Sequence, residues 1–300
     1  MSRLIVLGNC VAERLAYLLA RAIDVLGADW RVVSAPLVFH LKPGPDTDAL
    51  ATRAAQCDLV FSQPLFSFGA CNTAELGPRV LAAGKRFVTF AAPNFEAYFP
   101  DVLAVPCADS KMAFSPPLDW HSSIIAQCFA MNLPEEEATR IYPAHPLFRE
   151  RAVALAIERS LALYEKREQN VDINTLPLVR QYYSVEPMFH TWNHPAERLL
   201  LHLLDGMLEA MGLTAGERQQ ARAAVTDPAW GWDWSFGFNR WPVITRHHKL
   251  FAFAGRESFR IAGVDTSLED TITGYYNFYR FHPQTLAAVL AAMEKKIRQP

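Results

Sequence analysis

Short apolar runs alternate with helical patterns over the first hundred residues of the chain. The run LIVL at 4–7 ends at a glycine and predicts a buried strand over residues 3–8. Apolar positions then recur every three or four residues, which predicts an amphipathic helix over 11–26 that stops at Gly27. The alternation continues with predicted strands over 30–38, 57–63 and 86–93 and predicted helices over 46–56 and 72–85.

Two of these helices carry signals at or near their ends. An Asp or Thr at the start of DTDALATRAAQ (46–56) is expected to cap that helix. The pair Gly77-Pro78 lies inside 72–85. It predicts a break in the helix, or a helix that begins only at the proline, because proline lacks the N–H that a helix interior needs.

The predicted fold class is α/β. Strands separated by helices at this spacing predict a parallel sheet with flanking helices over 1–110, as in Rossmann-like folds. The second part, 111–300, is mainly helical, with helical patterns over 145–169, 195–212 (Pro195 in its first turn), 267–281 and 283–299. No linker or repeat separates the two parts, so we expect one intertwined unit.

Three polar side chains lie at or just after the ends of predicted strands. They are Cys10, Gln63 and Asn94. Ligands of open parallel sheets bind at the carboxyl ends of the strands. These residues are therefore grouped as parts of one candidate site.

Composition narrows the class of protein. Of the 300 residues, 51% are hydrophobic and 20% are charged, which excludes a disordered chain. The net charge of −2 gives no global field that would recruit nucleic acid or an acidic membrane. The five cysteines show no CxxC spacing, so neither a disulfide framework nor a metal site is expected.

We expect no targeting signal and no membrane-spanning segment in this sequence. The N-terminal apolar run is too short for a secretion signal, and no stretch reaches the roughly 18 apolar residues of a spanning helix. Free cysteines fit a reducing compartment. We expect a soluble, cytoplasmic protein.

The turn Gly8-Asn9-Cys10 is the first candidate for chemistry. A thiol at the start of a helix lies near free backbone N–H groups and the positive end of the helix dipole, so we expect it to ionise more readily. Gly8 would let a ligand approach the backbone, and the Asn9 side chain could donate a hydrogen bond to an oxyanion. The alternative is that Cys10 is a small buried hydrophobic residue.

The second candidate is the stretch FHTWNHPAERLL at 189–200. His194 precedes Pro195 and is expected near the N-cap of the following helix, beside Asn193 as a natural capping residue. A histidine oriented in this way suits a general base. The alternative is an ordinary helix start in which His190 and His194 are polar edge residues.

Two loops and several cations complete the candidates. Asn94, Tyr98 and Asp101 follow a strand in a proline-bounded loop, and Ser62 and Gln63 end the preceding strand. No GxxxxGK[ST] or GxGxxG motif is present, so a phosphate would need a helix N-terminus and scattered cations. These are Arg14, Arg180 and the cluster Arg246-His247-His248-Lys249, although each could also be a solvated surface charge.

Aromatic residues gather between 230 and 241. They could stack on a sugar ring or an adenine, or they could fill the core. The set is Trp230, Trp232, Trp234, Phe236, Phe238 and Trp241.

The order of several short motifs resembles one family. LIVLGNC at the start, CDLVFSQP at a later strand end, the Pro93–Asp101 loop and NHPAERLL resemble the WcbI-type capsular polysaccharide biosynthesis proteins. The likeness extends to the closing YYNFYRF segment. It implies a cradle-like fold, binding of coenzyme A or acetyl-CoA without a metal, and O-acetyl transfer to capsule sugars. Val11 stands where the family has Gln, which removes one polar group from the implied pocket.

The GNC turn is also similar to the nucleophile turn of SGNH-type esterases, with Cys10 in place of serine. The DxxH motif of those enzymes is missing, since Tyr279-Arg280-Phe281 precede His282. The resemblances leave three hypotheses. The first is an acyl-CoA-dependent O-acyltransferase with Cys10 and His194 as catalytic residues and a sugar or polysaccharide acceptor. The others are an SGNH-like hydrolase and a non-catalytic CoA-, nucleotide- or sugar-binding protein.

Three points remain open at the level of sequence. Transfer could be direct or pass through a Cys10 acyl-enzyme. The acceptor sugar and the acyl group are not specified, and neither is the oligomeric state.

Overall fold

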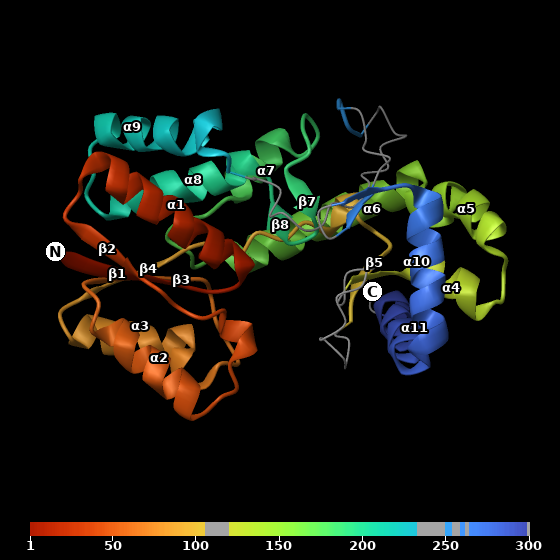
Figure 1. Ribbon diagram of the computed structural model, residues 1–300, viewed down its shortest axis with the longest axis horizontal. Coiled ribbons are helices and arrows are strands. Elements are labelled where there is room, and N and C mark those ends of the chain that lie inside the picture. The colour runs from red at the N-terminus through yellow and green to blue at the C-terminus, as the bar shows by residue number, and fades with distance from the viewer. Residues whose placement is uncertain (106–119, 233–249, 254–258, 262–263, 299–300) are drawn as a thin grey trace. The chain divides into compact units, whose positions relative to one another are not determined.

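The computed structural model describes residues 1–105, 120–232, 250–253, 259–261 and 264–298 (Figure 1). The chain forms two compact units, each built from three segments. The α/β unit comprises Met1–Pro93, Tyr164–Arg180 and Pro195–Trp234. The helical unit comprises Asn94–Leu163, Gln181–His194 and Ser235–Pro300.

A four-stranded parallel sheet forms the centre of the α/β unit, as the strand–helix alternation predicts. Its order is β2-β1-β3-β4. The strands are β1 (Ser2–Leu7), β2 (Trp30–Val33), β3 (Leu59–Ser62) and β4 (Arg86–Thr89). The predicted α/β fold class is therefore confirmed.

Helices cover both faces of this sheet (Figure 1). One face carries α2 (Pro45–Ala55) and α3 (Thr73–Ala82), and the other carries α1 (Cys10–Leu26) and α8 (Glu197–Ala210). Helix α9 (Ala215–Thr226) packs on α1 and α8. The unit also contains η1 (Val38–His40), η2 (Gly69–Cys71) and η5 (Pro228–Trp230).

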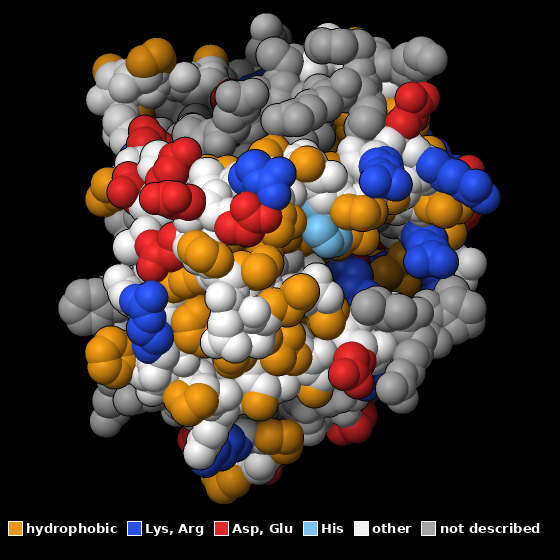
Figure 2. Space-filling model, turned by 90° about the vertical axis from the view of Figure 1, so that its right-hand side faces the viewer, with side chains coloured by type: hydrophobic (Ala, Val, Ile, Leu, Met, Phe, Trp, Pro, Cys, Tyr) orange, Lys and Arg blue, Asp and Glu red, His pale blue; other side chains and the backbone are white. Residues whose placement is uncertain are grey.

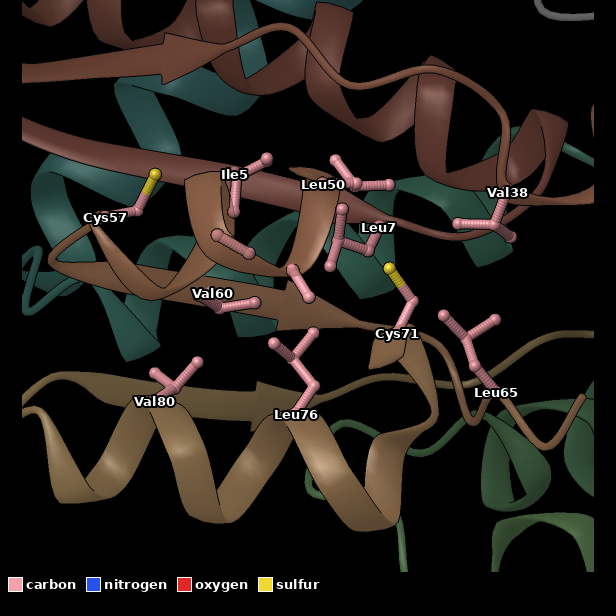
Figure 3. Close-up of a cluster of buried hydrophobic side chains, with 12 residues drawn as sticks. Ile5, Leu7, Val38, Leu50, Cys57, Val60, Leu65, Cys71, Leu76 and Val80 are labelled. Carbon is pink, nitrogen blue, oxygen red and sulfur yellow. The ribbon is translucent and has the colours of Figure 1, made fainter. Parts of the chain in front are cut away.

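The face under α2 and α3 holds a hydrophobic core (Figure 3). Ile5 and Leu7 point from β1 toward Leu50 of α2 and Leu76 of α3, and Val60 joins them from β3. Fully burying one aliphatic side chain of this size contributes roughly 1.5–3 kcal/mol. Leu4 to Leu7 are all buried, and side chains alternate between the two faces along a strand, so Ile5 and Leu7 share the face toward these two helices.

Three local predictions in this unit are wrong. Strand β2 ends at Val33 rather than at residue 38, because Pro36 has no N–H for strand pairing and η1 follows. Helix α3 runs unbroken through Pro78, since its buried residues Leu76 and Val80 hold it on the sheet. The N-cap of α2 is Gly44, whose N–H donates to the Thr47 hydroxyl at 3.0 Å, rather than an Asp or Thr.

The helical unit has short strands and several packed helices. Its strands are β5 (Val102–Ala104), β6 (Trp120–Ser122), β7 (Phe189–Thr191), β9 (Phe259–Ile261) and β10 (Val264–Thr266). Strand β8 (His194–Pro195) contributes His194 to this unit and Pro195 to the α/β unit. Its helices are η3 (Glu96–Tyr98), α4 (Ser123–Ala130), α5 (Glu135–Ala144), η4 (Pro146–Phe148), α10 (Leu268–Phe281) and α11 (Pro283–Arg298). Helix α6 (Glu150–Glu168) and helix α7 (Leu176–Tyr182) each contribute residues to both units.

The predicted helix over 145–169 begins later than expected. His145 has extended backbone angles and precedes Pro146, which disfavours the helical conformation before it. The chain makes η4 first, and α6 starts at Glu150. Within the described part of the chain, no helix combines the length and apolar character needed to cross a membrane.

Candidate functional site

The turn between β1 and α1 places Cys10 at the first residue of the helix. Asn9 is the N-cap, and its Oδ1 accepts a hydrogen bond from the Val11 N–H at 2.9 Å. The Glu13 N–H donates to the Asn9 carbonyl oxygen at 3.2 Å. With Oδ1 used for capping, Nδ2 is the group of this amide that can still donate.

Gln63 ties the ends of three strands together beside this turn. Its side chain is 2% exposed. Its Oε1 accepts from the Asn9 N–H at 2.9 Å, its Nε2 donates to the Ala91 carbonyl oxygen at 3.4 Å, and its own N–H donates to Leu7 at 2.9 Å. The amide therefore positions the turn.

Gly8 is required by this packing. Its φ of +156° is rare for other residues. A Cβ at Gly8 would lie 2.3 Å from Gln63 Oε1 and 2.8 Å from the Ala12 Cβ. The space that a Cβ at Gly8 would occupy is filled by the Gln63 amide, and the approach of a ligand to the Gly8 backbone stays a prediction.

The electrostatics of Cys10 differ from the sequence-based expectation. Burial raises the pKa of the Cys10 thiol to about 11, and this outweighs the opposing effect of the backbone N–H groups of Val11 and Cys10. The prediction of a thiol that ionises readily at the helix start is therefore wrong for this arrangement. At neutral pH the side chain is a thiol.

Two other candidates in the α/β unit use their polar groups within the protein. Ser62 is fully buried, and its hydroxyl donates to the Gln63 carbonyl oxygen at 2.8 Å. Arg180 is half exposed and forms an ion pair with Glu165 at 3.0 Å.

Arg14 lies over an aromatic stack. Its guanidinium is 5.1 Å from the centre of the Trp232 ring, and Trp232 stacks on Trp230 at 4.8 Å with planes 5° apart. Both rings thus pack against side chains of the same unit. The other predicted aromatic residues, Trp234, Phe236, Phe238 and Trp241, lie outside the described residues, as do Cys107 and the basic cluster 246–249.

His194 lies in the helical unit and does not cap a helix. Helix α8 begins at Glu197 with Ala196 at its N-cap, and His194 and Pro195 form strand β8 next to β7. The extended pairing holds both residues out of the helix, so the predicted helix start is wrong. His194 is 8% exposed, and its ring centre lies 4.9 Å from that of Trp120.

The neighbours of His194 have separate roles. Asn193 Oδ1 accepts from the Thr191 hydroxyl at 3.2 Å and caps no helix. His190 is half-buried in β7. Trp120, which sequence reasoning missed, packs on His194, and no local pattern could reveal a contact between residues so far apart in the chain.

The Pro93–Asp101 loop is largely a packing element. The Tyr98 hydroxyl donates to the carbonyl oxygens of Tyr183 and Glu186, and burial raises its pKa. Asp101 is buried and accepts from Ser122 at 2.6 Å and Tyr142 at 3.1 Å. Asn94 lines a cavity within the helical unit.

The predicted residues thus form two groups in two units. Gly8, Asn9, Cys10, Ser62 and Gln63 gather at the carboxyl ends of β1 and β3 in the α/β unit. The helical unit contains Asn94, Tyr98, His190, Asn193 and His194. No cluster of three or more His, Cys, Asp or Glu side chains suited to a metal ion occurs among the described residues.

The comparisons with known proteins agree with this fold. The family model of polysaccharide biosynthesis enzyme WcbI matches residues 3–216. Among solved structures, WcbI, a novel polysaccharide biosynthesis enzyme, is similar over 97% of this chain and 98% of its own, with a TM-score of 0.66 and 15% identity. That structure is the native protein without a disulfide bond between coenzyme A and one of its cysteines.

No curated protein sequence is significantly similar to the chain. The family match covers well over half of the 300 residues and includes the GNC turn, all four strands of the sheet and the His194 segment. The fold of the similar structure extends over nearly the whole chain. The chain therefore belongs to the family of the polysaccharide biosynthesis enzyme WcbI.

Proposed function

We propose that this protein transfers an acyl group, acetyl in the simplest case, from coenzyme A to a sugar hydroxyl during the biosynthesis of a capsular or other surface polysaccharide. Membership of the polysaccharide biosynthesis enzyme family carries the proposal. The association of the similar WcbI structure with coenzyme A supports the choice of donor.

The proposed reaction joins the acceptor oxygen to the thioester carbonyl carbon. The new C–O bond forms, the C–S bond breaks, and the proton of the sugar hydroxyl ends on the sulfur of coenzyme A. The negative charge that develops on the carbonyl oxygen needs preorganised donors. The Asn9 Nδ2 is the group of the GNC turn with this chemistry, because the Asn9 and Val11 N–H groups already donate within the protein.

We favour direct transfer over a Cys10 acyl-enzyme. With a pKa of about 11, only about one Cys10 thiol in ten thousand is ionised at pH 7. A covalent route depends on the thiolate, whereas direct transfer does not. In this version Cys10 contacts the donor as a neutral thiol.

His194 is the proposed base for the sugar hydroxyl. A buried imidazole held in β8 against Trp120 has a restricted orientation, which suits proton transfer at a defined atom. Arg14 and Arg180 are proposed to contribute to binding of the coenzyme phosphates. The free cysteines Cys10, Cys57, Cys71 and Cys128 support a cytoplasmic location.

Thermal-shift titration tests the choice of donor. Coenzyme A and acetyl-CoA at 100 times Kd should each stabilise the fold by about 2.7 kcal/mol, whereas ATP, as an unrelated nucleotide, should not. Stabilisation by neither coenzyme species would refute the proposal.

A transfer assay tests the chemistry. Release of the coenzyme thiol from acetyl-CoA should require a sugar acceptor, and Cys10→Ser should retain most of the turnover while His194→Gln loses it. Loss of turnover in Cys10→Ser, with an acyl group trapped on Cys10 of the wild type, would establish the two-step route instead. Cleavage of simple esters without coenzyme A would favour the hydrolase.

A further inference from the structure

A cavity of about 470 Å³ lies entirely within the helical unit. One face of α6 forms its longest wall, through Ala152, Leu155, Ala156, Arg159 and Leu163. These positions follow the pattern i, i+3, i+4, i+7 and i+11, so they share one side of the helix. The small side chains of Ala152 and Ala156 leave room that larger residues would fill.

The same wall exposes apolar side chains. Leu155 is 46% exposed and Leu163 is 39% exposed. Leu103 of β5, Leu147 of η4 and Met293 of α11 face the cavity from the other elements. Cavities of this size with mostly apolar walls and a few polar groups are typical of small-molecule sites.

The charges at the cavity favour an anion. Lys296 is paired with Glu96 at 3.3 Å, so these two lining charges compensate each other. Arg159 also lines the cavity and makes no ion pair within the described part of the chain. Its guanidinium can hold a carboxylate through two parallel hydrogen bonds. On the face shown in Figure 2, Lys and Arg side chains lie beside exposed hydrophobic ones.

We propose that this cavity binds a carboxylate that bears an aliphatic chain, with the chain against the apolar face of α6 and the carboxylate on Arg159. The site lies within one unit and is independent of the proposed acyl transfer. An anionic group without a chain would not contact Leu155 and Leu163 of α6. A purely apolar ligand would not bind the Arg159 guanidinium.

Binding of dodecanoate below its micelle concentration tests the proposal. Isothermal titration should give one site per chain. Ala156→Phe, which fills the cavity, and Arg159→Gln should each weaken binding by about tenfold or more. Arg140→Gln removes an exposed arginine of α5 that pairs with Glu137 outside the cavity, and it should bind as the wild type does. Ala152→Phe is the second filling variant if Ala156→Phe is unstable.

Five outcomes would overturn the proposal. Undiminished binding to both filling variants would place dodecanoate elsewhere. Equal affinity for dodecanol would remove the role of the carboxylate, and tighter binding of dodecyl phosphate would assign a phosphate head. Displacement of dodecanoate by coenzyme A, together with weaker coenzyme binding in Arg159→Gln, would make the cavity a coenzyme site. A thermal shift with coenzyme A, together with no binding of dodecanoate, would refute this inference. The proposed function would then remain intact.

Discussion

At the scale of single residues, Gly8 and Gln63 form the tightest constraint in the α/β unit. The Gln63 amide is buried and holds two hydrogen bonds, so it cannot swing away without leaving polar groups unpaired. Any side chain at position 8 meets this amide and the Ala12 methyl group. The backbone there is therefore shaped by an internal contact.

We expect Gly8→Ala to lower the free energy of unfolding by about 3 kcal/mol, because overpacking and an unfavourable φ act together. Gly84→Ala is a matched control. Its φ is +71°, and among the described residues no atom beyond its chain neighbours lies within 4 Å of the position that a Cβ would occupy, so it should cost only about 1 kcal/mol. Urea denaturation measures both, and equal losses would contradict the role of Gln63.

At the scale of elements, the N-terminus of α1 depends on one capping bond. We expect Asn9→Ala to destabilise the protein by about 1 kcal/mol, because the Val11 N–H loses its acceptor. Asn9→Asp keeps that acceptor and should keep the stability.

The same two variants separate structure from chemistry. If the Asn9 Nδ2 stabilises the oxyanion, Asn9→Asp should lower the transfer rate by about a hundredfold despite its normal stability. Denaturation curves and rates of thiol release measure the two effects. An active Asn9→Asp variant would assign Asn9 to capping alone.

The packing of β6 on α10 makes stability depend on pH. His121 has no exposed surface, its Nδ1 lies 3.0 Å from the Tyr279 hydroxyl, and burial lowers its pKa to about 4. Between pH 6.5 and 4 the unfolded chain binds a proton at this residue and the folded chain does not. Stability should therefore fall as the pH falls through this range.

The expected loss is up to about 3 kcal/mol, since one pKa unit corresponds to about 1.4 kcal/mol. Urea denaturation at a series of pH values measures the slope for the wild type and for His121→Gln. The variant should show a flatter slope over this range. Identical slopes would show that groups other than His121 set the acid sensitivity.

Local patterns predicted the four strands of the sheet and several helices, but not the short strands of the helical unit or the contacts that select between alternatives. The parallel sheet and its order of strands and helices follow from the spacing of apolar residues, as β1 and α1 illustrate. Pro78 and His194 show what such patterns miss. Packing on the sheet keeps α3 helical through a proline, and pairing with β7 keeps His194 extended. The raised pKa of Cys10 depends on burial, which its sequence neighbours do not specify.

At the scale of the whole molecule, the α/β unit requires segments from distant parts of the chain. Helix α1 buries Leu15, Leu18 and Leu19, and it packs against α8 and α9. Both of those helices follow residue 195. The strands and helices of the first 93 residues therefore do not make a complete core.

We expect a fragment of residues 1–163 to lack cooperative unfolding, because the apolar face of α1 has no cover. Co-expression with residues 164–300 should restore it. Near-ultraviolet circular dichroism and urea denaturation measure both samples. A cooperative transition in the short fragment alone would contradict this dependence.

The fit between Gly8 and Gln63 also has an evolutionary consequence. A methyl group at one position and a long amide at the other exclude each other, so the two sites should vary as a pair among relatives. Lineages with a larger residue at the first position should carry a shorter one at the second, and they would need another way to join the three strand ends.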